Sequence, residues 1–378
     1  MKIAIEAQRI FRKDKHGMDF VALETIRELQ QRADGNDYYI LVAPGADRCL
    51  EESAHVHIVE VKCPTYPLWE QLALPLALKK LQVDLLHCTS NTAPLWCPVP
   101  LVLTLHDIIY LEPRAHRSSS WYQEMGWYYR RFVVPRILSQ CRRILTVSEF
   151  ERKRIMEQLH LPAEQVVTVY NGYNPRFRRL QSEETQAARR YMPQAEYLFF
   201  LGNTDPKKNT KGVLQAYARY LERSAHKCRL LIADLKEETL DTLLKAEQLE
   251  PIRPYITCPG YIPNADLPSI YNAAFAFLYP SLRESFGIPM IEAMACGTPV
   301  IVSNTSAMPE VAGDGALQVD PFQPDTIADA LLQLERDASF RAELIAYGLK
   351  QATRYSWRST AEAWVQIYRE VLHHSNSN

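Results

Sequence analysis

The sequence lacks the features that would make its cysteines a metal site or a disulfide framework. Among 378 residues it has eight cysteines, no two of which form a Cys-x-x-Cys pair or lie beside histidine at zinc-site spacing. They are Cys49, Cys63, Cys88, Cys97, Cys141, Cys228, Cys258 and Cys296. Free cysteine is usually a buried apolar side chain in a reducing compartment. We therefore expect a cytoplasmic chain with reduced thiols and no bound metal.

Long apolar runs and a strong net charge are also missing. No apolar run reaches the roughly 18 residues that a membrane-spanning helix needs. The opening MKIAIEAQRI predicts a strand and has neither the basic nor the apolar region of a signal peptide. A formal net charge of −1 argues against a protein that coats nucleic acid. The length favours two globular domains.

Short β-branched runs alternate with longer amphipathic ones, which is typical of a parallel α/β sheet. In the first half the predicted strands are KIAIEA, YYILVAP, VHIVEV, VDLLHC, PLVLTL, RILTVS and VVTVY. The polar segment NPRFRRLQSEE, which has no clear periodicity, then predicts a domain boundary. A second series follows with YLFFLGN, CRLLIAD, AFAFLYP and PVIVSN.

These two series predict two doubly wound, Rossmann-like α/β domains that face each other across a cleft. The first would comprise residues 1–180 with 356–378, and the second residues 181–355. A helix from near Ser356 has its larger apolar residues on one face, Val365 apart. We expect this helix to cross back to the first domain.

The stretch ESFGIPMIEAMACGTPVI, residues 284–301, has the most informative chemical pattern. Glu284 follows the apolar run AFAFLYP, and ligands bind at the carboxyl ends of such parallel strands. Pro289 and Gly297 suit the first turn and the C′ position of a short helix, whose start favours a phosphate. Glu292, one turn in, could accept hydrogen bonds from a diol. A nucleotide sugar fits this pattern, because it has a diol on each side of a diphosphate. Alternatively, both glutamates are solvated surface charges.

Together with SNTSAMPEVAGDGALQVDP, this stretch resembles the donor-site signature of retaining GT-B glycosyltransferases, specifically glycosyltransferase family 4, the group 1 glycosyl transferases. The Glu-x7-Glu signature is matched by Glu284 and Glu292. Further matches follow the family's order over nearly the whole chain: LTLHDIIYL, LTVSEFERKRIMEQL, VVTVYNGYNPRF, FLGNTDPKKNT, PGYIPNADLPSIYNAA and YSWRSTAEAWVQIYREVL. The resemblance implies a GT-B fold and transfer of a hexose from a nucleotide diphosphate sugar to a glycan or lipid-linked glycan.

The resemblance also implies roles for individual residues. Glu284 would contact the transferred sugar and Glu292 the ribose. Lys208 would neutralise the leaving diphosphate, and His106 would face the reacting centre from the first domain. The implied catalytic residues are thus His106, Glu284 and Lys208, with no metal and no cofactor besides the donor. The other implied donor-binding positions are Gly17, Asn203, Thr204, Lys207, Tyr261, Ile262, Ser285, Phe286, Gly287 and Ile288.

The chain departs from the family pattern at the phosphate loop. Asn203 and Thr204 stand where many members have an arginine, so Lys207 or Lys211 would supply a second positive charge. Ser285 replaces a frequent glycine. The PKKN form of the loop is similar to enzymes of bacterial surface polysaccharide and lipopolysaccharide assembly, many of which use GDP-mannose. The resemblance therefore implies mannose as the transferred sugar.

Several alternatives remain open at this stage. His106 could be a structural hydrogen-bonding residue at a strand end. The basic segment 121–143 could be a solvated helix face or a surface for anionic lipid headgroups at the inner face of the plasma membrane. For the whole chain, the alternatives are a glycosidase, a sugar-nucleotide epimerase and a non-catalytic nucleotide-sugar-binding protein. We expect no nucleic-acid partner.

Overall fold

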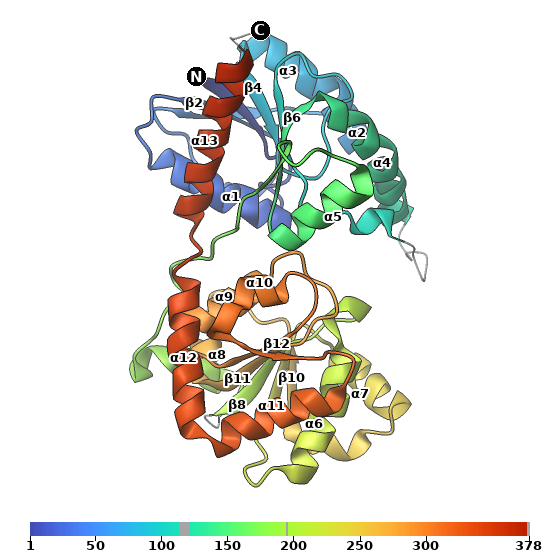
Figure 1. Cartoon of the computed structure of the whole chain (residues 1–378), viewed down its shortest axis with the longest axis vertical. Helices are drawn as coiled ribbons and strands as arrows, with labels where there is room; N and C mark the ends of the chain where they lie inside the picture. Colours follow the sequence, from blue (N-terminus) through green and yellow to red (C-terminus); the bar gives the residue numbers. More distant parts are fainter. Residues whose placement is uncertain (113–120, 194–195, 376–378) are drawn as a thin grey trace. The chain divides into compact units, whose positions relative to one another are not determined.

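The computed structural model describes residues 1–112, 121–193 and 196–375. The chain divides into two compact units, Met1–Gly172 with Trp357–Asn378 and Tyr173–Ser356. Each unit contains one parallel sheet with helices packed on it (Figure 1). The predicted α/β fold class with two doubly wound sheets is confirmed.

The first unit has a seven-stranded sheet in the order β3-β2-β1-β4-β5-β6-β7. Its strands are β1 (Lys2–Glu6), β2 (Asp37–Val42), β3 (Val56–Glu60), β4 (Leu85–Cys88), β5 (Leu101–Thr104), β6 (Cys141–Thr146) and β7 (Val166–Thr168). Its helices are α1 (Gly17–Gln30), α2 (Tyr66–Leu68), α3 (Leu74–Leu81), α4 (Trp121–Ile137), α5 (Glu149–Leu159) and α13 (Trp357–Ser375). The π-helical turn Trp69–Ala73 joins α2 to α3, so residues 66–81 form one continuous helical segment.

Alternate residues of β1 point to opposite faces of this sheet, as the two-residue period of a strand requires. Ile3 and Ile5 pack in one core with α1 and α13, whereas Ala4 packs in another with α3, α4 and α5. Tyr368 of α13 is fully buried and its hydroxyl lies 2.7 Å from Nδ1 of His87 in β4. The last helix therefore returns to the first unit, as predicted, and lies beside α1 (Figure 1).

The second unit has a six-stranded sheet in the order β10-β9-β8-β11-β12-β13. Its strands are β8 (Tyr197–Leu201), β9 (Leu230–Ala233), β10 (Ile256–Gly260), β11 (Ala274–Tyr279), β12 (Val300–Ser303) and β13 (Leu317–Val319). Its helices are α6 (Thr210–Arg223), α7 (Glu237–Ala246), α8 (Leu267–Ala273), α9 (Ile288–Ala295), α10 (Met308–Ala312), α11 (Pro324–Arg336) and α12 (Ala338–Ala352). The apolar run of β11 is buried from Phe275 onward, because this strand lies in the middle of the sheet.

Each sheet has one position at which the strand order reverses. In the first unit the chain runs outward from β1 to β3 and then returns to place β4 on the other side of β1. In the second unit the reversal lies between β8 and β11. Ligands of open α/β sheets bind beyond the carboxyl ends of the strands at such a position. The segments that follow β1, β4, β8 and β11 are therefore the places to look for a site.

Candidate functional site

Lys208 and Glu284 form an ion pair where the strand order of the second unit reverses. Lys208 ends the short helical turn Pro206–Lys208 after β8, and Glu284 follows β11. The distance from Lys208 Nζ to Glu284 Oε1 is 2.6 Å, and the two side chains are only 24% and 15% exposed. The backbone N–H of Glu284 donates to Ser306 Oγ at 3.1 Å. The structure thus brings together two of the three residues proposed as catalytic.

Asn209 holds the loop that carries Lys208. Its φ of 59° lies in the left-handed region, which asparagine tolerates better than most residues. Its side-chain amide donates to the carbonyls of Pro280 at 3.0 Å and Pro321 at 2.8 Å. Gly212 leaves room for that amide, because a Cβ there would lie 2.4 Å from Asn209 Oδ1. One side chain therefore ties together the loops that follow β8, β11 and β13.

Tyr279, the last residue of β11, completes this cluster, although no sequence pattern singled it out. Its hydroxyl accepts from Lys208 Nζ at 3.5 Å, and the carboxylate of Glu284 lies close enough to affect its pKa. Lys208 Nζ also lies 5.3 Å from the centre of the tyrosine ring, within cation–π range. Burial, followed by the charge of Glu284, holds the pKa of Tyr279 well above its usual value. The phenol is therefore a neutral hydrogen-bond donor at physiological pH.

Helix α9 begins beside this cluster. Gly287 precedes it with φ 95°, and a Cβ there would lie 3.2 Å from Met308 Sδ, so the turn needs glycine. Phe286 is buried and its ring packs edge-on against Tyr355, with centroids 5.5 Å apart. Gly297 follows the helix with φ 76°. The first N–H groups of a helix have no intrahelical acceptor, so this end attracts an anion.

Glu292 lies on α9 near the same tyrosine. The charges of Glu284 and Glu292 both raise the pKa of Tyr279, so the two carboxylates lie near one side chain. Burial raises the pKa of Glu292 to about 8, although nearby Arg176 acts to lower it. The carboxyl group is thus mostly protonated at neutral pH. It can then donate one hydrogen bond as well as accept others.

The lysines expected to add a second positive charge have partners of their own. Lys207 Nζ lies 3.3 Å from Asp205 Oδ2, and Lys211 Nζ lies 2.7 Å from Oε1 of Glu247, the residue that follows α7. Asn203 Oδ1 accepts from the backbone N–H of Asp205 at 2.9 Å. Its side chain therefore stabilises the turn in front of Lys208.

The other proposed donor-binding residues of the second unit lie on loops at the same edge of the sheet. The side chains of Thr204 and Tyr261 are exposed, and Ser285 is partly buried. Ile262 is buried, and two residues before it the carbonyl of Gly260 accepts from the backbone N–H of Asp234, which follows β9, at 2.8 Å. At Tyr261 and Ile262 the main chain thus runs along the carboxyl edge of the sheet.

His106 lies in the first unit, after β5, and is buried and hydrogen-bonded. Its backbone N–H donates to Asn91 Oδ1 at 2.7 Å, and its Nε2 lies 3.0 Å from the carbonyl oxygen of Thr89. Because a carbonyl only accepts, Nε2 carries a proton. Burial lowers the pKa of His106, so the ring is neutral. His106 thus makes the hydrogen bonds of the structural role that the sequence left open.

Gly17 is the first residue of α1, in the loop that follows β1. It is exposed, and no atom lies within 4 Å of the position a Cβ would take. Two residues on, Asp19 accepts from the backbone N–H of His16 at 2.9 Å and pairs with Arg9 Nε at 3.0 Å. The start of α1 therefore already holds one carboxylate.

No sequence pattern indicated that two glutamates of the first unit, Glu6 and Glu70, are buried. Glu6 ends β1, and its carboxylate accepts from the backbone N–H groups of Gln8 at 3.0 Å and Thr89 at 3.3 Å. Burial raises the pKa of Glu6 to about 7, and nearby Glu70 adds to the increase. Glu70 accepts from three hydroxyls, those of Tyr66, Thr92 and Tyr129. Glu6 thus ends β1 and bonds to Thr89, and Glu70 bonds to Thr92, so both glutamates contact the segment that follows β4, next to the strand-order reversal.

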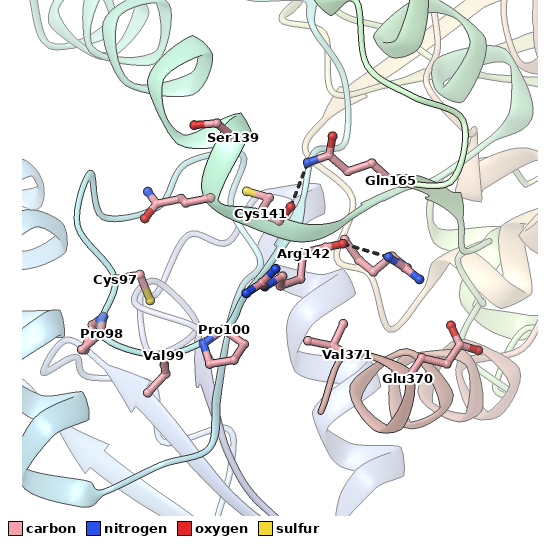
Figure 2. A pocket seen from close by; sticks show the side chains of 12 residues that line it. Cys97, Pro98, Val99, Pro100, Ser139, Cys141, Arg142, Gln165, Glu370 and Val371 are labelled. Atoms are coloured by element: carbon pink, nitrogen blue, oxygen red, sulfur yellow. Dashed lines mark hydrogen bonds between the residues drawn. The ribbon is translucent and has the colours of Figure 1, made fainter. Parts of the chain in front are cut away.

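The basic segment 121–143 is not one helix, which corrects the sequence-based expectation of a single helix face. Arg130, Arg131 and Arg136 lie on α4, but α4 ends at Ile137 and Arg142 and Arg143 lie in β6. The side chains of residues 121–123 lie outside the described part of the chain. A cavity of about 730 Å³ is lined by Arg142 and Arg143 at the amino ends of β5 and β6, away from the carboxyl edge (Figure 2).

All eight cysteines are free. Within the described ranges, no three His, Cys, Asp or Glu side chains are grouped as a metal ion would require. In the same residues, no helix combines the length and apolar character that crossing a bilayer demands.

Comparison with known proteins identifies the family. The family model described as Glycosyltransferase Family 4 matches residues 16–177, and the one described as Glycosyl transferases group 1 matches residues 182–351. O-antigen chain mannosyltransferase B of Escherichia coli is 33% identical over 275 residues, which are 71% of this chain and 70% of that protein.

A second relative and a solved structure extend the comparison. The serotype-specific mannosyltransferase WbdA of Escherichia coli is 26% identical over 237 residues, 61% of this chain but only 29% of that protein. HepE of Anabaena, solved in complex with UDP-glucose, superposes with a TM-score of 0.74 at 17% identity, covering 98% of this chain and 100% of that one. This structural similarity shows that the two chains share a fold. The chain therefore belongs to glycosyltransferase family 4, the group 1 glycosyl transferases, and has the GT-B fold.

Proposed function

We propose that this glycosyltransferase moves a hexose from a nucleotide diphosphate sugar to a glycan or lipid-linked glycan, with retention of anomeric configuration. The observation that supports this most directly is the Lys208–Glu284 pair beside the start of α9. The names of the O-antigen and serotype-specific mannosyltransferase relatives favour mannose as the sugar, with GDP-mannose as the donor. The product then belongs to a surface polysaccharide such as lipopolysaccharide.

Stabilisation of the leaving group is the core of the proposed mechanism. As the bond between the sugar and the diphosphate breaks, negative charge grows on the diphosphate. Lys208 and the N–H groups at the start of α9 stabilise that charge more in the transition state than in the bound donor. The ammonium of Lys208 and the start of α9 thus stabilise the charge, and the proposal requires no resident metal.

Glu284 acts on the sugar in this proposal. Its carboxylate is held by Lys208, beside Tyr279. When the diphosphate takes over Lys208, Glu284 is released to accept hydrogen bonds from the sugar hydroxyls. Its negative charge also stabilises the positive charge that develops at the anomeric carbon. We assign it as a positioning and electrostatic group and not as a nucleophile.

Glu292 binds the ribose hydroxyls, and the main chain at Tyr261 and Ile262 borders the base. Accepting two hydroxyl donors favours the ionised carboxylate. Because the pKa of Glu292 is about 8, binding of the donor releases a proton near neutral pH.

The first unit contributes His106 and Gly17. The neutral ring of His106 holds its proton on Nε2, toward Thr89, so Nδ1 is an acceptor for a substrate hydroxyl. Gly17 leaves space for close approach of the donor at the start of α1. We place the reaction in the cytoplasm at the inner face of the plasma membrane, where α4 contacts lipid.

Two measurements test the proposed function. A thermal-shift panel of GDP, UDP, dTDP and ADP sugars identifies the donor, since a ligand stabilises the state that binds it. Release of nucleoside diphosphate is then followed with and without a glycan acceptor, and the anomeric configuration of the product is determined by NMR. Acceptor-dependent release with retention supports the proposal. Conversion of the donor without acceptor would indicate an epimerase, and product formed without donor would indicate a hydrolase.

A further inference from the structure

The helical segment 66–81 presents a stripe of leucines to solvent. Leu68, Leu72 and Leu76 are 44%, 58% and 67% exposed. Their spacing of four residues places them on one side of the segment. On its other side Trp69 and Leu78 are buried in the core. An exposed leucine stripe on a helix that already has a packed apolar side needs a further partner to cover it.

The neighbouring elements add aromatic side chains to this stripe. Leu95 and Trp96, in the loop that follows β4, are 42% and 56% exposed. On α4, Met125, Tyr128 and Phe132 are 49% to 56% exposed. Eight of the thirteen large apolar side chains that are exposed in the described residues thus come from these three elements. Such a concentration distinguishes the region from the scattered apolar residues of an ordinary surface.

Hydrogen bonds hold these three elements side by side. Gln71 Nε2 donates to the hydroxyl of Tyr129 on α4 at 2.8 Å, and Gln71 Oε1 accepts from the backbone N–H of Leu95 at 2.8 Å. The rings of Tyr66 and Tyr129 meet edge-on with centroids 5.9 Å apart. We call the exposed residues of 68–76, 95–96 and 125–132 the apolar surface.

Basic side chains border the apolar surface, and several cover its aromatic rings. Lys79 Nζ lies 4.7 Å from the centre of the Trp96 ring, and Arg136 lies 3.9 Å from that of Phe132. Lys80 is exposed beside Lys79 at the end of α3. Two acids occur among the described side chains of 65–82, 94–96 and 124–137: Glu70 is buried and Glu124 is half-buried. The surface is thus apolar and cationic with no exposed acid among these positions.

We propose that the apolar surface docks on a lipid bilayer with anionic headgroups. A helix that lies in the plane of a membrane has three features. Its leucines enter the interface, its aromatic rings lie at headgroup depth, and its lysines and arginines face the phosphates. A second copy of the chain fits less well, because two such surfaces would bring like charges together without acidic partners. The inference builds on the lipid contact proposed for α4 and extends it to residues 66–81 and 95–96.

Vesicle flotation of the full chain tests this without donor or acceptor. Vesicles of phosphatidylcholine alone are compared with vesicles that also contain phosphatidylglycerol. We expect binding to the mixed vesicles that is at least about tenfold tighter and weakens as salt is added. Equal binding to both kinds of vesicle, or to neither, would overturn the proposal.

Matched variants locate the contact. Leu72→Ser with Leu76→Ser should weaken binding to the mixed vesicles by at least about tenfold. Phe322→Ser is the control, because Phe322 is 68% exposed, like Leu76 at 67%, but lies in the second unit. Likewise, Lys79→Glu with Lys80→Glu should abolish the preference for anionic lipid, whereas Lys245→Glu should not. Unchanged vesicle binding of the leucine variant would refute the assignment.

Two further measurements distinguish a failure of the lipid proposal from a failure of the proposed function. The stabilisation of each variant by nucleotide sugars reports on the second unit, so it should remain while vesicle binding is lost. Sedimentation without lipid reports on association between copies. If the leucine variant turned a dimer into a monomer there, the surface would be a contact between copies, and the lipid proposal would be wrong.

Discussion

The ammonium of Lys208 lies 2.6 Å from a carboxylate oxygen of Glu284, although 76 positions separate the two residues in the sequence. Each therefore neutralises the other, and the hydroxyl of Tyr279 accepts a hydrogen bond from Lys208. In the proposed function, the diphosphate of a bound donor competes with the carboxylate of Glu284 for this ammonium. Removing either partner should thus affect the site in a different way.

Lys208→Ala should lower turnover by roughly 10² to 10³, the usual effect of losing one group that stabilises transition-state charge. The donor affinity should fall as well, because Glu284 would then face the diphosphate without its counter-ion. Steady-state release of nucleoside diphosphate measures both effects. Lys245→Ala, on an exposed position of α7, is the matched control and should leave turnover unchanged. Near-normal turnover of the Lys208 variant would remove this residue from the mechanism.

Glu284→Gln should also lower turnover by about 10² or more, but with a smaller loss of donor affinity. The amide keeps the shape of the side chain and loses the charge that stabilises the anomeric carbon. It also frees Lys208 for the diphosphate, which offsets part of the loss in binding. The ratio of the changes in kcat and KM distinguishes this outcome from that of Lys208→Ala. Glu238→Gln serves as a control, and equal losses in both constants for the two site variants would contradict the assigned roles.

Glu292→Gln should stabilise the folded chain at alkaline pH while weakening donor binding. Burial raises the pKa of Glu292 from 4.5 to about 8, so between these values the folded chain holds a proton that the unfolded chain has lost. The stability contributed by this group is therefore complete below pH 4.5 and decreases as pH rises toward 8. The variant does not titrate, so its advantage in unfolding free energy should grow over this range, to about 1–3 kcal/mol at pH 8.

Chemical denaturation at several pH values measures this difference, and thermal shift with donor measures affinity. For the unaltered chain, donor affinity should increase from pH 6 to pH 8, because the ribose binds the ionised carboxylate. A pH-independent affinity, or a variant that binds donor as tightly as the unaltered chain, would show that Glu292 does not bind the ribose.

Tyr368→Phe should destabilise the first unit by about 1–2 kcal/mol. The substitution removes the hydroxyl that lies 2.7 Å from His87 Nδ1 and leaves a buried ring nitrogen without that partner. Burial lowers the pKa of His87 to about 3, so the neutral ring is stable in the folded chain down to acid pH. Denaturant unfolding followed by tryptophan fluorescence measures the loss, with Tyr347→Phe, which is 53% exposed, as the control. Equal midpoints for the two variants would contradict this account.

The central strands of both sheets could be predicted from the sequence, but two edge strands of the second unit could not. β11 is apolar on both faces, because it is covered on both sides. β10 contains Pro259 and Gly260, and β13 has only three residues. Proline and short length are tolerated at the edges of a sheet, where one side of the strand has no partner. Such strands lack the apolar pattern that identifies an interior strand.

The positions of residues that depend on tertiary contacts could not be predicted from the sequence either. The helical segment 66–81 contains Pro67 and Pro75, and proline normally interrupts a helix. Here Pro67 lies in the first turn of α2, whereas Pro75 lies in the first turn of α3, directly after the π-helical turn. Glutamates are usually exposed, so the burial of Glu70 could not be expected before its hydroxyl partners were known. The family resemblance indicated Lys208 and Glu284, whereas their direct contact and the part played by Tyr279 required the fold.

The place of α13 has a consequence for synthesis of the chain. The second unit is continuous in sequence, from Tyr173 to Ser356, whereas the first requires the last helix to cover one face of its sheet. Domains generally fold as they leave the ribosome, beginning with the amino-terminal one. Here the unit that is made first lacks the helix that completes one face of its sheet until residues 357–375 have been synthesised. A nascent chain arrested before Trp357 would therefore leave part of that apolar face, beside α1, exposed to chaperones.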